Sequence, residues 1–89
     1  MGRERKFGGA GFVAACRHFP QHEFAIRRLM GENADFCDIC DELADAEAAL
    51  DRVDIAAPPH LRQLRRQEWS DLVDRLVREV SEALQDRRS

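Results

Sequence analysis

The sequence lacks the motifs by which common enzyme and membrane classes are recognised. It has no tyrosine, one tryptophan and three prolines in 89 residues. No apolar run approaches the roughly 20 residues that a membrane-spanning helix needs. There is no Ser-His-Asp set, no calcium loop and no glycine-rich loop following a strand, which is the pattern that phosphate binding requires. The sequence therefore predicts a protein that is not an enzyme, does not cross a membrane and carries no cofactor.

The short length and the odd number of cysteines further limit the class of protein to which this chain can belong. Eighty-nine residues form one small domain. The core of so small a domain gives only marginal stability, which self-association commonly increases. We recognise no secretory signal, because glycines interrupt the short apolar stretch near the start. Three cysteines without such a signal are typical of reduced thiols. We therefore expect a cytoplasmic protein.

Charge is unevenly distributed along the chain. Residues 1–31 carry six basic and two acidic side chains, residues 32–54 carry one basic and nine acidic, and residues 55–89 carry seven basic and six acidic. The acidic middle segment would repel a nucleic-acid backbone, and the arginines after it are interleaved with carboxylates. We therefore predict no binding to nucleic acid.

Residues 33–54 have the pattern of a helix with one narrow apolar stripe. The stripe consists of two interleaved seven-residue steps, Phe36, Leu43 and Leu50 and then Ile39, Ala46 and Val53. A partner helix must cover such a stripe, as in a coiled coil. Asn33 is placed to cap the first turn through its side-chain oxygen.

A second long helix is predicted over residues 59–85. The prolines of the segment 54–59 break the chain between the two helices, and a connection of about six residues makes such helices antiparallel neighbours. Arg62, Arg65 and Arg66 would then face Glu47 and Asp51. The predicted buried seam, which is also the predicted interaction core, consists of Phe36, Leu43, Leu50, Trp69, Leu72, Leu76 and Val80.

A short helix is predicted over residues 20–30, since Pro20 suits a first helical turn and Gly31 suits a helix end. Residues 1–18, which contain four glycines, are predicted to be a flexible tail with at most a short helical turn at 12–17. The sequence thus predicts an all-α fold. An antiparallel two-helix hairpin with coiled-coil-like packing occupies residues 19–86, and the short N-terminal helix lies against it.

The second long helix has more apolar surface than the first can cover. The surplus lies at residues 77–84, and either the short helix or another chain must cover it. This surplus favours a small protein–protein interaction or assembly module that forms a homo-oligomer. The sequence does not identify a protein partner.

A recognisable series of residues runs from residue 19 to residue 76. It comprises Phe19-Pro20, Ile26, Leu29, Ala34, Phe36, Leu43, Leu50-Asp51-Arg52, Leu61, Leu64 and Leu72-Val73-Asp74-Arg75-Leu76. In this series the chain resembles the YdcH-like family of small bacterial proteins, a domain of unknown function. The resemblance implies an antiparallel helical hairpin without known catalysis, so it implies no functional residues. Asp54 and Val73 depart from the family pattern, which has Glu and Lys at those positions.

Two histidines and two cysteines form the one pattern with potential metal chemistry. Cys37 and Cys40 have C-x-x-C spacing and follow His18 and His22, and two His with two Cys are a known structural zinc set. A metal- or redox-responsive regulator is therefore the alternative function. Against it, Cys40 belongs to the apolar stripe, Pro20 separates the histidines, and nearby aspartates raise a thiol pKa. We favour an apolar filler at Cys40 and a surface thiol at Cys37.

Overall fold

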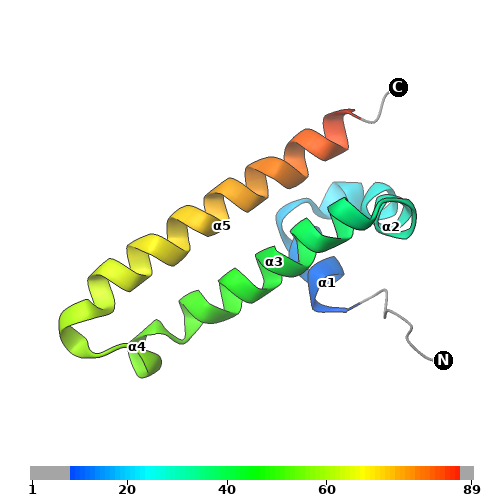
Figure 1. Ribbon diagram of the computed structural model, residues 1–89. Helices are drawn as coiled ribbons and strands as arrows, with labels where there is room; N and C mark the ends of the chain where they lie inside the picture. Colours follow the sequence, from blue (N-terminus) through cyan, green and yellow to red (C-terminus); the bar gives the residue numbers. More distant parts are fainter. Residues whose placement is uncertain (1–8, 87–89) are drawn as a thin grey trace.

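The computed structural model describes residues 9–86, and every regular element in that part of the chain is helical (Figure 1). The prediction of an all-α fold is therefore confirmed for these residues. The chain is divided more finely than expected, because five α-helices and two 3-10 turns replace the three predicted helices. The elements in order are α1 (Ala10–His18), η1 (Pro20–His22), α2 (Glu23–Glu32), α3 (Ala34–Asp51), α4 (Val53–Ala56), η2 (Pro59–Leu61) and α5 (Arg62–Gln85).

Helices α3 and α5 are the longest elements and lie side by side in opposite directions (Figure 1). The predicted cap of α3 is confirmed, since the Asn33 side-chain oxygen accepts a hydrogen bond from the Phe36 N–H at 3.1 Å. The chain leaves α3 after Asp51, forms the single turn α4, and enters η2 at Pro59, where a missing N–H is tolerated. No helix in residues 9–86 combines the length and apolar character needed to cross a bilayer.

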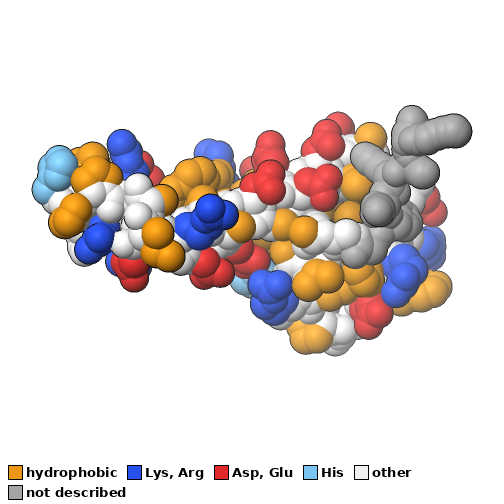
Figure 2. Space-filling model, turned by 90° about the horizontal axis from the view of Figure 1, so that it is seen from below, with side chains coloured by type: hydrophobic (Ala, Val, Ile, Leu, Met, Phe, Trp, Pro, Cys, Tyr) orange, Lys and Arg blue, Asp and Glu red, His pale blue; other side chains and the backbone are white. Residues whose placement is uncertain are grey.

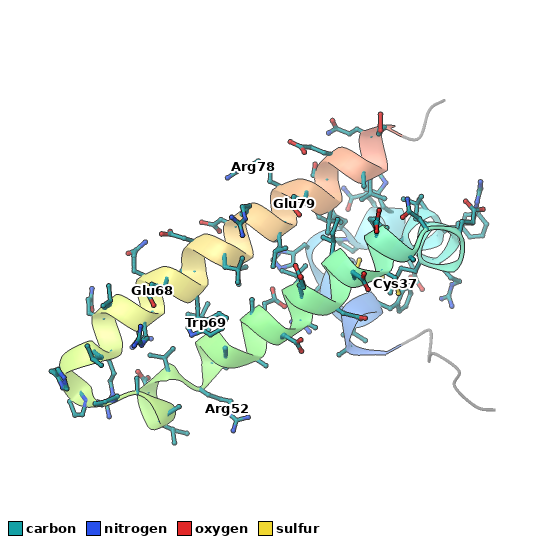
Figure 3. All side chains as sticks on the ribbon, viewed as in Figure 1. Cys37, Arg52, Glu68, Trp69, Arg78 and Glu79 are labelled. Atoms are coloured by element: carbon teal, nitrogen blue, oxygen red, sulfur yellow. The ribbon has the colours of Figure 1, made fainter. Side chains whose placement is uncertain are left out.

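The core lies where α1, α2, α3 and α5 meet. Four of the seven predicted seam residues belong to it, namely Phe36, Leu43, Leu76 and Val80. The prediction of full burial is wrong for Leu50, Trp69 and Leu72, which are only half-buried. Leu50 is in the last turn of α3, and Trp69 lies toward the same end of the two long helices, away from α1 and α2 (Figure 3), so neither is covered by the N-terminal helices. Leu72 borders a surface hollow lined by charged side chains of α5.

The predicted flexible tail is wrong for residues 10–18, which form α1 and pack against α3. Gly11, Ala14 and Ala15 of α1 are buried. A Cβ atom at Gly11 would collide with the Asp41 carboxylate and lie 3.0 Å from the Asp41 backbone nitrogen and from the Cys40 carbonyl carbon. Glycine thus permits the two helix backbones to approach closely. Residues 1–8 of the predicted tail lie outside the described residues.

The surplus apolar surface of α5 is covered within the chain. Val80 is fully buried and Leu84 is 9% exposed, and both belong to one core cluster with Ala15 of α1, Ile26 of α2 and residues of α3. A second chain is therefore not needed to cover residues 77–84. The argument for self-association that rested on this surface no longer holds, and any contact surface must lie elsewhere.

The predicted partners of the α5 arginines are also wrong. Arg66 pairs with Asp54 and Arg65 pairs with Glu68 of its own helix. Glu47 is instead held by α1, where the Arg17 Nη1 lies 3.2 Å from its Oε1 and the His18 ring nitrogen contacts its Oε2. The docking of α1 on α3 therefore changes which charges meet.

Candidate functional site

The most distinctive surface of the molecule is at the turn between the two long helices, residues 45–69, which we call the hairpin end. A groove of about 500 Å³ lies here between α3, α4, η2 and α5, and we call it the end groove. In Figure 3 the Trp69 side chain extends from α5 toward α3 at this end. The apolar lining of the end groove comes mainly from Ala48, Ala49, Val53, Ala56, Ala57, Pro58, Leu61 and Trp69. The charged lining residues of the groove are Asp45, Arg52 and Arg65.

The end groove exists because the residues facing it are small. Ala48 and Ala49 take up little volume at the end of α3, opposite the large ring of Trp69 on α5. The break at Pro58 and Pro59 carries the chain around the end as a short turn, so no further helix fills the space. The result is a concave apolar surface bordered by a few charged groups, which is the usual form of a binding site.

Exposed apolar side chains accompany the groove. Ile55 of α4 is 86% exposed and Leu64 of α5 is 51% exposed, and neither lines the groove. Phe24 of α2, at the opposite end of the molecule, is 73% exposed. Figure 2 shows apolar side chains, in orange, at the narrow left-hand end, which is the hairpin end. The groove and the exposed Ile55 and Leu64 at the same end make the hairpin end a candidate contact site.

A row of carboxylates on α3 leads to the end groove. Asp35, Asp38, Glu42 and Asp45 are all exposed and recur at three- and four-residue steps, so they lie along one side of the helix. We call this row the acidic stripe. None of the four forms an ion pair with another residue of the described range 9–86. Asp45 belongs both to the stripe and to the lining of the groove, so the two surfaces are continuous.

The histidines and cysteines of the alternative function are not brought together. His18 contacts Glu47, two helical turns along α3 from Cys40, while His22 is exposed in η1 and Cys40 is fully buried. Within residues 9–86 no group of three or more His, Cys, Asp or Glu side chains is close enough to hold a metal ion. The geometry gives no support to a metal-responsive site at His18, His22, Cys37 and Cys40.

The environment of Cys40 also disfavours redox chemistry. Burial, with smaller contributions from Cys37, Asp41 and Cys16, raises the pKa of the Cys40 thiol to about 12. The thiolate is the reactive form of cysteine, and a raised pKa suppresses it. Cys40 therefore acts as a small apolar side chain in the core.

This environment predicts how the cysteines react in the folded protein. With iodoacetamide near pH 9, the ordinary pKa of the thiol, the half-buried Cys37 should be alkylated much faster than Cys40. Peptide mass spectrometry after a timed reaction measures both rates, and the same reaction in concentrated urea should make them equal. If Cys40 reacts as fast as Cys37 in the folded protein, the thiol is not buried as the structure places it.

Comparisons with known proteins identify no relative of this chain: no protein-family model, no curated protein and no solved structure matches it. Its function must therefore be argued from the surface alone. The sequence did not reveal the end groove, because much of its lining consists of alanines, which belong to no binding motif. The pairing of Ala48-Ala49 with Ala56-Ala57 before two prolines was the one signal that side-chain volume is missing there.

Proposed function

We propose that the protein is a small non-enzymatic interaction module that uses the hairpin end to contact other proteins and to self-associate. The observation that carries this proposal is the exposure of Ile55, 86% of whose surface is in water beside an apolar groove. The groove lining of alanines, Val53, Leu61 and Trp69 suits apolar side chains of a partner.

The two long helices are the framework of this module in our proposal. They act as an antiparallel hairpin with coiled-coil-like packing, braced by the N-terminal helices, and they hold the hairpin end away from that brace. Membership of the YdcH-like family stays a prediction, and it would imply the same hairpin without adding an activity. The three free cysteines support a cytoplasmic location, where thiols stay reduced.

Self-association through the hairpin end predicts an effect of one charge. The unmodified protein should sediment as a dimer or larger species in the micromolar range, and Ile55→Asp should shift it toward the monomer, because a carboxylate cannot be buried in an apolar contact without a partner. Sedimentation velocity over a range of concentrations measures the shift. The matched control is Phe24→Asp, which changes an equally apolar exposed residue at the other end of the molecule.

Two outcomes would decide against self-association at this surface. If the unmodified protein is a monomer at all the concentrations tested, it does not self-associate. If only Phe24→Asp dissociates the oligomer, the contact lies on α2 instead.

A further inference from the structure

We infer that the hairpin end binds a cationic amphipathic helix of another protein, whose basic residues pair with the acidic stripe and whose large apolar side chain fills the end groove. The inference rests on the proposed use of the hairpin end as a contact surface, and it adds the chemistry of the partner. Two independent features carry it, namely the stripe carboxylates, which form no ion pair with another residue of the range 9–86, and the apolar groove that begins where the stripe ends.

The acidic stripe sets the charge and the shape of the partner. Asp35 and Asp45 are ten residue steps apart in α3, about 15 Å along the helix axis. A second helix lying alongside presents side chains at the same three- and four-residue steps, so arginines or lysines spaced in this way would each meet a carboxylate.

The end groove sets the position of the apolar anchor. Asp45 stands at the junction of the stripe and the groove, while Arg52 and Arg65 line the groove beyond it. A basic side chain in the groove would be repelled by these two guanidinium groups, whereas an apolar one would pack on the alanines and on Trp69. The partner therefore has its basic residues first and its apolar anchor about one to two turns farther along the helix.

A second copy of this chain is a poorer match to the acidic stripe. Five arginines already form ion pairs within the chain, namely Arg17, Arg27, Arg28, Arg65 and Arg66. On the exposed side of α5, Arg75 and Arg78 lie among Asp71, Asp74 and Glu68, so that side offers mixed charge. No described helix of the chain presents an unbroken basic row to the acidic stripe of a neighbouring copy.

A synthetic peptide tests the inference directly. The probe is a helical peptide of about 18 residues, roughly 27 Å long, with arginines at three- and four-residue steps and one phenylalanine near one end. Trp69 is the only tryptophan of the chain and lines the groove, so its fluorescence reports occupation. We expect a saturable fluorescence change that weakens with added salt. The control peptides replace the arginines by glutamates or the phenylalanine by alanine, and both should bind weakly or not at all.

Variants of the protein separate the two parts of the surface, with affinities measured by calorimetry. Neutralising the stripe by D38N, E42Q and D45N together should lower the affinity for the arginine peptide by about tenfold. The matched control D71N, D74N and E82Q, on exposed positions of α5, should change the affinity by less than about twofold. Filling the groove by Ala49→Leu should weaken binding by about tenfold or more, while Phe24→Asp should leave it unchanged because Phe24 lies at the opposite end of the molecule and does not line the groove.

Each failure has a distinct meaning. If no saturable binding occurs, or if the glutamate peptide binds as well as the arginine peptide, the inference is wrong. If Ala49→Leu weakens binding and neutralising the stripe does not, the hairpin end is a contact surface but its partner is not cationic. If binding of the peptide falls as the protein concentration rises, a second copy occupies the groove. A monomer that still binds the peptide contradicts the self-association proposal alone.

Discussion

Replacing Leu43 by alanine is expected to lower the free energy of unfolding by about 2–5 kcal/mol. Leu43 is fully buried and lies in the core cluster that joins α3 to α5 and to the N-terminal helices. The substitution removes apolar contacts and leaves a cavity that close-packed neighbours cannot fill completely. Since small domains are stable by only about 5–15 kcal/mol, a loss of this size is a large fraction of the total.

Urea unfolding followed by circular dichroism measures the loss. The matched control is Leu64→Ala, in which the same atoms are removed from a side chain that is 51% exposed, and its effect should stay within about 0.5 kcal/mol. A loss below about 0.5 kcal/mol for Leu43→Ala, or equal losses for the two leucines, would show that Leu43 is not in the core.

Replacing Gly11 by alanine is expected to cost about 1–3 kcal/mol, because the added methyl group overpacks the contact between α1 and α3. Two of the atoms it would meet, the Asp41 nitrogen and the Cys40 carbonyl carbon, belong to the backbone of α3 and lie at 3.0 Å. Backbone inside a helix cannot rotate aside as a flexible side chain can, so α1 must shift or detach. A shift would also disturb the contacts of Arg17 and His18 with Glu47.

The sign of the effect makes this test specific. Alanine has the higher helix propensity, so glycine to alanine at an exposed helical position should stabilise by up to about 1 kcal/mol. Gly31, exposed in α2, provides that control as Gly31→Ala. We expect opposite signs for the two variants in urea unfolding. If Gly11→Ala is as stable as the unmodified protein, α1 does not approach α3 as closely as the structure shows.

The parts of the fold that could be predicted from the sequence are those with a local cause. The seven-residue steps through Phe36 and Leu43 define a helix and its buried side whatever surrounds them, and the Asn33 cap depends only on the next three residues. The prolines at 58 and 59 mark the turn for the same reason. These features located α3 and α5 from the sequence, with small differences at their ends.

The docking of α1 could not be predicted from the same reasoning. Its contact with α3 is made by Gly11, Ala14 and Ala15, which contribute by letting two backbones approach rather than by carrying a large apolar side chain. In a sequence such residues resemble a flexible segment. Because α1 docks on α3, Glu47 contacts Arg17 and His18 of α1. The ion pairs predicted between Glu47 and the arginines of α5 are therefore not formed.

The exposed apolar surface was also predicted in the wrong place, for a related reason. The sequence put the uncovered apolar surface at residues 77–84, because it assigned no neighbour to that part of α5. The structure covers Val80 and Leu84 and leaves Ile55 and the end groove uncovered. Ile55 lies in a segment predicted only as a break, and its exposure depends on how α4 and η2 turn in three dimensions.

The claim on which these conclusions depend is that α1 belongs to the folded core. An isolated helix of nine residues is too short to be stable in water, so protection of its amides can only come from docking. Hydrogen exchange of the unmodified protein measures this directly. We predict that the amides of Ala14 and Ala15 exchange nearly as slowly as that of Leu43 in α3. Exchange at the rate of an unfolded peptide throughout residues 10–18, with α3 still protected, would contradict the account.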